Sequence, residues 1–276
     1  MRFACPCFVL ALFLAGSVNA WGAEPSADQE KAVAALTALG GKVGRATKAP
    51  DSPYSTVNLA DTKMTDDNLA PLEALPEIRS LSLRHGYKLT DAAVAHLKGL
   101  TKLEILDLWD FKITDAGLKG LAACTELRDL NLGGTAITDA GVALLSQFPK
   151  LEQLNFQYTK IGDGGMACLK DLPKLASLNL SLTQVTDKGL AAVGELKGLH
   201  SLYLPSAITD AGLAHLRGMT GLHVLGLRGT KVTDAGLANL TGLTELSSLD
   251  LVDTNVTDEG VKIFQASLPQ CRILRK

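Results

Sequence analysis

The sequence predicts an α/β fold, a right-handed solenoid with a parallel β-sheet on its concave side and α-helices on its convex side. One observation is an aspartate that recurs every 23 to 25 residues, because a period in the twenties is typical of stacked supersecondary units. A second is a change of hydrophobic period within each interval, from alternation ahead of the aspartate to steps of three and four residues after it. The recurring aspartates are Asp66, Asp91, Asp115, Asp139, Asp163, Asp187, Asp210, Asp234 and Asp258.

Each interval begins with a short strand, which is clearest in the unit around Leu130. Leu130 and Leu132 are expected to point into a core and Asp129, Asn131 and Gly133 into solvent, because side chains of a strand alternate between its faces. About 24 residues are too few to close a core alone, so the units must stack. Paired strands lie about 4.8 Å apart and packed helices about 8–10 Å apart, which places the helices on the outside of a curve.

Each interval continues with a helix that starts at the aspartate. Thr114 occupies the expected N-cap position, and Asp115 lies in the first turn, where the helix dipole favours a carboxylate by about 0.3–1 kcal/mol. Leu118 and Leu121 form the buried side of this helix. We expect Gly117 to let the helix approach its strand closely. Every helix needs a capping group, whereas a catalytic group is needed once, so the aspartates are interpreted as structural rather than catalytic or calcium-binding.

The repeated pattern resembles a known family, the leucine-rich repeats. The pattern L-x-x-L-x-L stands at residues 103–108, 151–156 and 246–251, and I-T-D-x-G-L stands at 113–118. This form is most similar to the cysteine-containing-like subclass with 24-residue repeats, as in exported bacterial repeat proteins. The resemblance covers residues 54–276, about nine repeats, and implies a horseshoe fold and a tendency to bind proteins. Where that subclass has cysteine or asparagine after the strand, this chain mostly has threonine, expected to bury its methyl group and pair its hydroxyl with backbone: Thr62, Thr135, Thr159, Thr183, Thr230 and Thr254.

The chain divides into three expected regions. Residues 1–20 read as a signal peptide, with Arg2, an apolar run over 8–15 and small residues before the cleavage point, so we expect a secreted or periplasmic protein without membrane insertion after cleavage. Residues 21–53 are expected to form an N-terminal capping helix, opened by a capping box from Ser26 to Gln29, and a connector. Residues 54–276 form the solenoid, with a closing strand at its C-terminal end.

Cysteine usage and charge limit the possible partners. Three cysteines remain after cleavage, Cys124, Cys168 and Cys271, and an odd number cannot pair completely, so we expect buried free thiols. The chain has 27 basic and 29 acidic residues, which argues against a nucleic-acid surface because that would need a basic stripe.

A binding site is expected on the solvent side of the strands, the one surface that the repeat does not dictate. The repeats also depart from their pattern at residues 84–88, at Phe111 and at Pro205, and functional sites tend to lie at such departures. We predict a shallow site in which Gly133 and Gly134 form a floor between two aromatic side chains; in the alternative interpretation Trp109 only packs on its neighbours. The predicted ligand-binding residues are Asp107, Trp109, Asp110, Asp129, Asn131, Gln157, Tyr158 and Tyr203.

No motif in the sequence indicates catalysis, so we expect no enzymatic activity, no cofactor and no metal. His200 and His223 occupy the same position in adjacent repeats and could stack, but they lack a carboxylate partner for a metal site. The leading hypothesis is a secreted scaffold that binds a protein, a peptide or a cell-surface glycan. One alternative is a structural component of an envelope or matrix, and another is a hydrolase that uses Asp107 and Asp129 as a carboxylate pair.

Overall fold

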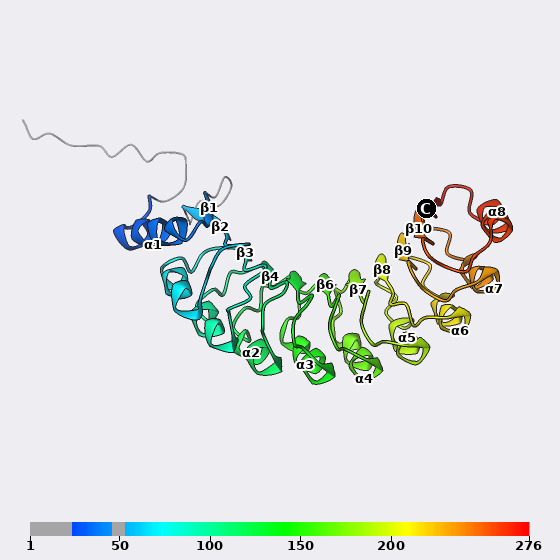
Figure 1. Ribbon diagram of the computed structural model, residues 1–276, viewed down its shortest axis with the longest axis horizontal. Coiled ribbons are helices and arrows are strands. Elements are labelled where there is room, and N and C mark those ends of the chain that lie inside the picture. Colours follow the sequence, from blue (N-terminus) through cyan, green and yellow to red (C-terminus); the bar gives the residue numbers. More distant parts are fainter. Residues whose placement is uncertain (1–23, 46–52, 276) are drawn as a thin grey trace, which may run out of the picture.

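The computed structural model describes residues 24–45 and 53–275, which form a single arc with a sheet along the inside and helices along the outside (Figure 1). The predicted fold class is confirmed. Within these ranges no helix combines the length and apolar character needed to cross a membrane. The expected signal peptide of residues 1–20 lies outside the described residues.

The sheet has 11 strands that follow one another in sequence order. From β2 onward every neighbouring pair is parallel, and the register keeps equivalent leucines side by side, such as Leu106, Leu130 and Leu154. The strands are β1 (Lys42–Arg45), β2 (Tyr54–Asn58), β3 (Ser80–Ser82), β4 (Ile105–Asp107), β5 (Asp129–Asn131), β6 (Gln153–Asn155), β7 (Ser177–Asn179), β8 (Ser201–Tyr203), β9 (Val224–Gly226), β10 (Ser248–Asp250) and β11 (Arg272–Leu274).

The convex side consists of short helices, and in each repeat unit the first helix starts at the recurring aspartate as predicted, in four units with a short 3-10 helix directly after it. In the first two units the helix is of the tighter 3-10 type. These two units have Asn68 and Ala93 at the position where the later units have glycine, and the first also contains Pro71. The helices are α1 (Ala27–Ala38), η1 (Asp66–Ala74), η2 (Asp91–Leu97), α2 (Asp115–Gly120), α3 (Asp139–Ala143), η3 (Leu144–Gln147), α4 (Asp163–Met166), η4 (Ala167–Asp171), α5 (Asp187–Val193), α6 (Asp210–Leu213), η5 (Ala214–Leu216), α7 (Asp234–Leu237), η6 (Ala238–Leu240) and α8 (Asp258–Ser267).

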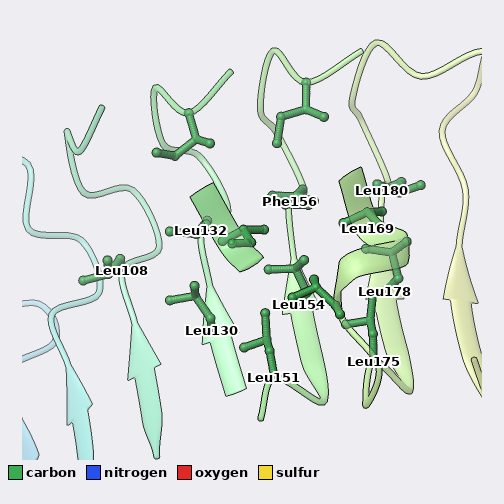
Figure 2. Close-up of a cluster of buried hydrophobic side chains, with 14 of the residues drawn as sticks. Leu108, Leu130, Leu132, Leu151, Leu154, Phe156, Leu169, Leu175, Leu178 and Leu180 are labelled. Carbon is green, nitrogen blue, oxygen red and sulfur yellow. The ribbon is translucent and has the colours of Figure 1, made fainter. Parts of the chain in front are cut away.

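The core is a continuous row of leucines between the sheet and the helices. Leu130, Leu132 and Phe156 extend from the strands and the turns after them into this row (Figure 2), and all three are fully buried. Burial of one such side chain stabilises a fold by about 1.5–3 kcal/mol, and the buried leucines of successive units belong to one continuous cluster. The units therefore stabilise one another rather than folding singly.

The N-terminal end is closed by a helix and an additional strand. The capping box that the sequence predicts is present in α1, because the Gln29 amide donates to Ser26 Oγ at 3.2 Å and the Ser26 amide donates to Gln29 Oε1 at 2.9 Å. The expectation of a plain connector after this helix is wrong for residues 42–45. They form β1, which pairs antiparallel with β2 and places Val43 opposite Val57, so the edge of β2 is not left open.

Two sets of side-chain hydrogen bonds repeat along the arc. In the first, the hydroxyl of the threonine after the strand donates to the carbonyl three residues earlier, as from Thr159 to Phe156 at 2.7 Å, which confirms the predicted backbone pairing. In the second, the recurring aspartate accepts hydrogen bonds from the threonine that caps the helix of the following unit, as from Thr186 to Asp163. The sequence predicted the capping threonines but not this link between units.

The recurring glycine has a role beyond the one expected. A Cβ atom on Gly141 would lie 2.2 Å from Oδ1 of Asp115 in the preceding unit and 2.7 Å from Cγ2 of Ile137. The glycine therefore makes room mainly for the carboxylate of the neighbouring unit, a role that was not predicted, and it also lets the helix lie close to Ile137 of its own unit.

The three cysteines of the described residues are free, as predicted. Cys124 and Cys271 are buried, and burial raises the pKa of the Cys124 thiol to about 11. Cys168 is only partly buried, so the expectation of burial is wrong for this residue, which lies on the short helix η4 at the convex side.

Candidate binding surface on the concave face

A row of asparagines runs across the middle strands of the concave face. Asn131, Asn155 and Asn179 stand in register on β5, β6 and β7. In each, Oδ1 accepts a hydrogen bond from the backbone amide two residues later, at 3.1, 2.9 and 2.9 Å. The side-chain oxygens thus hold the turn that follows each strand. The Nδ2 groups of Asn131 and Asn155 are left as donors, whereas Nδ2 of Asn179 lies 3.5 Å from Oε1 of Gln157. Asp107 and Asp250 make the same turn in their own units.

A hollow of about 250 Å³ lies over these strands. Asp129 is the carboxylate in its lining, and no lysine, arginine or histidine lines it. Burial and the negative charge of Asp107 raise the pKa of Asp129. The hollow is lined by Asp129, Asn131, Gln153, Leu154, Asn155, Ser177, Asn179 and Tyr203.

An aromatic cluster stands beside the hollow, where the strands end. The rings of Trp109 and Tyr158 meet edge to face, with centroids 6.2 Å apart and an angle of 87° between their planes. The guanidinium group of Arg84 lies 5.0 Å from the centre of the Trp109 ring, within the range of a cation–π interaction, and its Nη1 is 3.8 Å from Oδ2 of Asp107. Tyr158 is 60% exposed, so the cluster has a face that is open to a partner.

The predicted floor of this site is not open. A Cβ atom on Gly133 would lie 2.2 Å from Cε3 of Trp109, so the indole ring covers Gly133. Gly134 has φ +67°, a conformation that favours glycine, and a Cβ atom there would meet Oδ1 of Asp110 at 2.0 Å. The two glycines are thus needed to seat Trp109 and Asp110, and the Trp109 ring packs on Gly133, Arg84 and Tyr158.

The predicted ligand-binding residues fall into two groups. The aromatic cluster contains Trp109 and Tyr158, with Asp107 joined to it through Arg84 and Asp110 beside Gly134. The hollow contains Asp129, Asn131 and Tyr203. Gln157 lies between the groups, because its Oε1 is 3.5 Å from Nδ2 of Asn179. That these residues bind a ligand stays a prediction.

The charged residues next to this cluster were not among the predicted site residues. His85 has φ +60°, and its Nδ1 lies 2.5 Å from Oδ1 of Asp61 and its Nε2 3.9 Å from Oδ2 of Asp110. Its ring stacks on Tyr87 with centroids 5.6 Å apart. The sequence does mark this position, because His85 lies in the repeat unit that has one extra residue, and functional sites tend to lie at such departures from the pattern.

The two histidines that directly precede β8 and β9 lie next to each other as expected, but their rings meet edge to face, at 74°, and do not stack. The ring centroids of His200 and His223 are 5.2 Å apart, and the Nδ1 atoms of both face the carbonyl oxygen of Gly221, at 3.0 and 2.7 Å. Within residues 24–45 and 53–275, no three histidine, cysteine, aspartate or glutamate side chains are grouped so that they could hold a metal ion.

Comparison with known proteins agrees with this geometry. A family model described as Leucine Rich repeat matches residues 123–146, 149–170, 171–194 and 243–262. No curated protein matches the sequence.

The chain is similar in fold to three solved bacterial proteins. An internalin (inlF) from Listeria monocytogenes has a TM-score of 0.59 and 22% identity, over 79% of this chain and 66% of its own. An internalin C2 (inlC2) from the same organism has a TM-score of 0.59 and 24% identity, over 89% of this chain and 92% of its own. A Leptospira interrogans LRR protein has a TM-score of 0.51 and 17% identity, over 78% of this chain and 58% of its own. The matched repeats and the curved parallel sheet together show that this chain has the fold of a leucine-rich repeat solenoid.

Proposed function

We propose that the protein is a non-catalytic scaffold that recognises another protein or a peptide through its concave face. The observation that carries this proposal is the partly exposed cluster of Trp109, Tyr158 and Arg84 at the border of a polar hollow. The repeat itself uses leucine, aspartate, threonine and glycine, so it needs none of these three side chains. Tryptophan, tyrosine and arginine are enriched among the residues that dominate binding energy at protein interfaces.

We also propose an extracytoplasmic location. The support is the signal-peptide pattern of residues 1–20, after which the chain would not be inserted in a membrane. Residues 21–53 would then be an N-terminal cap and residues 54–276 the repeat domain. The I-T-D-x-G-L form of the repeats supports the cysteine-containing-like subclass with 24-residue repeats.

A hydrolase is the second candidate, because one observation favours it. Burial and the charge of Asp107 raise the pKa of Asp129, which is the coupling expected of a carboxylate pair. The hollow is open and its other lining groups are amides, a serine, a leucine and a tyrosine, which supply no nucleophile with an adjacent base. We therefore place this candidate second.

The test is an affinity capture with the purified full chain as bait and the extracellular and envelope fractions of the producing cells as the source. We expect one stoichiometric partner that the Trp109→Ala/Tyr158→Ala variant no longer retains. Ile263→Ala is the matched control, because Ile263 is 64% exposed on α8 at the convex side. Capture that does not depend on the concave variant contradicts the proposal. Pelleting of the chain with the envelope favours a structural component or a surface glycan, and turnover of a peptide or polysaccharide that Asp129→Asn abolishes favours the hydrolase.

A further inference from the structure

Resting on the proposed function, we propose that the hollow over β5 to β8 recognises an extended peptide segment that carries a lysine or arginine. The main-chain carbonyl groups of the segment accept hydrogen bonds from the row of asparagines, and its basic side chain pairs with Asp129. Three features of the hollow favour such a segment: the direction of the amide groups, the unpaired carboxylate and the side chain at its far end.

The row of asparagines presents donors rather than acceptors. In Asn131, Asn155 and Asn179 the side-chain oxygen is held by the backbone amide of the following turn, which fixes the orientation of each amide group. Among the described residues the nitrogen is the free end in Asn131 and Asn155, and in Asn179 it makes a long contact of 3.5 Å with Oε1 of Gln157. Neighbouring strands lie about 4.8 Å apart and an extended chain advances about 3.3 Å per residue, so a segment laid across the sheet meets one donor for about every one or two residues. Carbonyl groups are the acceptors that such a segment offers.

The carboxylate of Asp129 lacks a counter-charge. Among the residues described, the side-chain carboxylate of Asp129 takes part in no hydrogen bond or ion pair, although its backbone amide donates to the carbonyl of Glu104, and the lining of the hollow contains no basic side chain. Asp107 on β4 adds a second negative charge that Arg84 neutralises in part, at 3.8 Å. A half-buried carboxylate without a partner is unfavourable, and a cation from a ligand removes that penalty.

The far end of the hollow is closed by an aromatic ring. Tyr203 on β8 lies over Gly226, where an added Cβ atom would meet Cδ1 of Tyr203 at 2.4 Å. Tyr203 is 39% exposed, so its ring offers an apolar surface to a second side chain of the segment, three strands away from Asp129. A donor row, one unpaired acid and an aromatic end wall together fit a basic extended peptide.

The test is a binding assay on an array of random-sequence octapeptides, acetylated and amidated at their ends, with the purified full chain as the probe. We expect lysine and arginine to be enriched among bound peptides, and the best basic peptide to bind at least tenfold more tightly than its counterpart with glutamine in place of the basic residue. Asp129→Asn should remove this preference. Asp250→Asn is the matched control, because Asp250 makes the same turn on β10, outside the hollow, and this variant should keep the preference.

A second variant tests the donor row. Asn155→Asp keeps the turn, since Asp107 and Asp250 make it in their own units, but replaces the donor with a carboxylate oxygen that repels carbonyl groups. Binding of the glutamine peptide should weaken at least threefold, and unchanged or tighter binding overturns the assignment of the row. Absence of basic enrichment, or binding of cellulose or chitin oligosaccharides in place of peptides, overturns the proposed ligand. In that case, capture of a protein partner that depends on Trp109 and Tyr158 would still support the proposed function. Failure of the peptide proposal can therefore be distinguished from failure of the proposed function.

Discussion

Asp115 holds Thr138 of the following unit with both of its carboxylate oxygens. Oδ1 accepts from the Thr138 amide at 2.9 Å, and Oδ2 accepts from its hydroxyl at 2.6 Å. The same hydroxyl accepts from the amide of Ala140 and so caps its own helix. One threonine thus starts a helix and ties two units together. The described pairs of this kind are Asp66 with Thr90, Asp91 with Thr114, Asp115 with Thr138, Asp163 with Thr186, Asp187 with Thr209, Asp210 with Thr233, and Asp234 with Thr257.

Removal of the link between aspartate and threonine should lower the free energy of unfolding more where the aspartate uses both of its carboxylate oxygens. Asp115→Ala deletes two hydrogen bonds, whereas Asp139→Ala deletes one, from the Gly162 amide at 2.7 Å. A hydrogen bond to a charged group contributes about 1.5–3 kcal/mol, so we expect Asp115→Ala to lower the free energy of unfolding by about 1–3 kcal/mol more than Asp139→Ala. Urea denaturation of both variants measures this difference, and equal losses would show that the second hydrogen bond adds nothing.

The junction between units at Gly162 has fewer hydrogen bonds than the neighbouring junctions, and a substitution can add them. Gly162 stands where the neighbouring units have threonine, its helix has no side-chain cap, and a Cβ atom there would lie 3.7 Å from Oδ2 of Asp139, without a clash. Gly162→Thr should therefore gain the cap and the missing hydrogen bond and raise the free energy of unfolding by about 0.5–2 kcal/mol. Thr138→Gly makes the reverse change and should lower it. A lower melting temperature for Gly162→Thr would contradict this account.

The glycine that faces the carboxylate should not tolerate a methyl group. In Gly141→Ala the new Cβ would lie 2.2 Å from Oδ1 of Asp115, and overpacking of this kind costs about 1–3 kcal/mol. This cost exceeds the helix-propensity gain of about 1 kcal/mol. Gly242→Ala is the control, because nothing lies within 4 Å of the added atom. Thermal unfolding should show a drop for the first variant and little change for the second.

The aspartate links also predict how stability depends on pH. Burial raises the pKa of Asp163, but hydrogen bonds from the amide and hydroxyl of Thr186 and from the amide of Gly189 outweigh it, so its net pKa is lowered. The hydroxyl and amide of Thr257 likewise lower the pKa of Asp234. A lowered folded-state pKa gives stability that is complete above the unfolded value, about 3.9, and is lost as pH falls through the folded value. Urea denaturation at pH 7 and pH 3 should show a lower free energy of unfolding at pH 3. The decrease between the two pH values should be smaller for Asp163→Asn than for the natural chain.

The sequence was sufficient for the architecture but not for the contacts between units. Local patterns place the strands and the helix starts, because alternation and capping are properties of neighbouring residues. The bond between Asp115 and Thr138 joins residues 23 positions apart, and the space above Gly141 is defined by the preceding unit, so neither can be inferred from one unit alone.

The candidate site was predicted in part for the same reason. Trp109 and Tyr158 come together because both lie at the ends of strands in nearby units. Tyr203 belongs to the hollow instead, because it lies on a strand and not at its end. The indole ring of Trp109 is large enough to reach over Gly133, so it covers the surface that was predicted to be the floor of the site.

The most direct test of the central claim, that the inner wall of the arc is the binding surface, is the affinity of the captured partner for Trp109→Ala measured by calorimetry. Trp109 packs between Arg84 and Tyr158, so its loss removes the centre of the aromatic cluster. We expect the dissociation constant of Trp109→Ala to be at least tenfold larger, a loss of about 1.4 kcal/mol or more of binding free energy. The dissociation constant of Ile263→Ala should equal that of the natural chain. A partner that binds Trp109→Ala as tightly as the natural chain, or that is lost only with Ile263→Ala, would place the binding surface elsewhere.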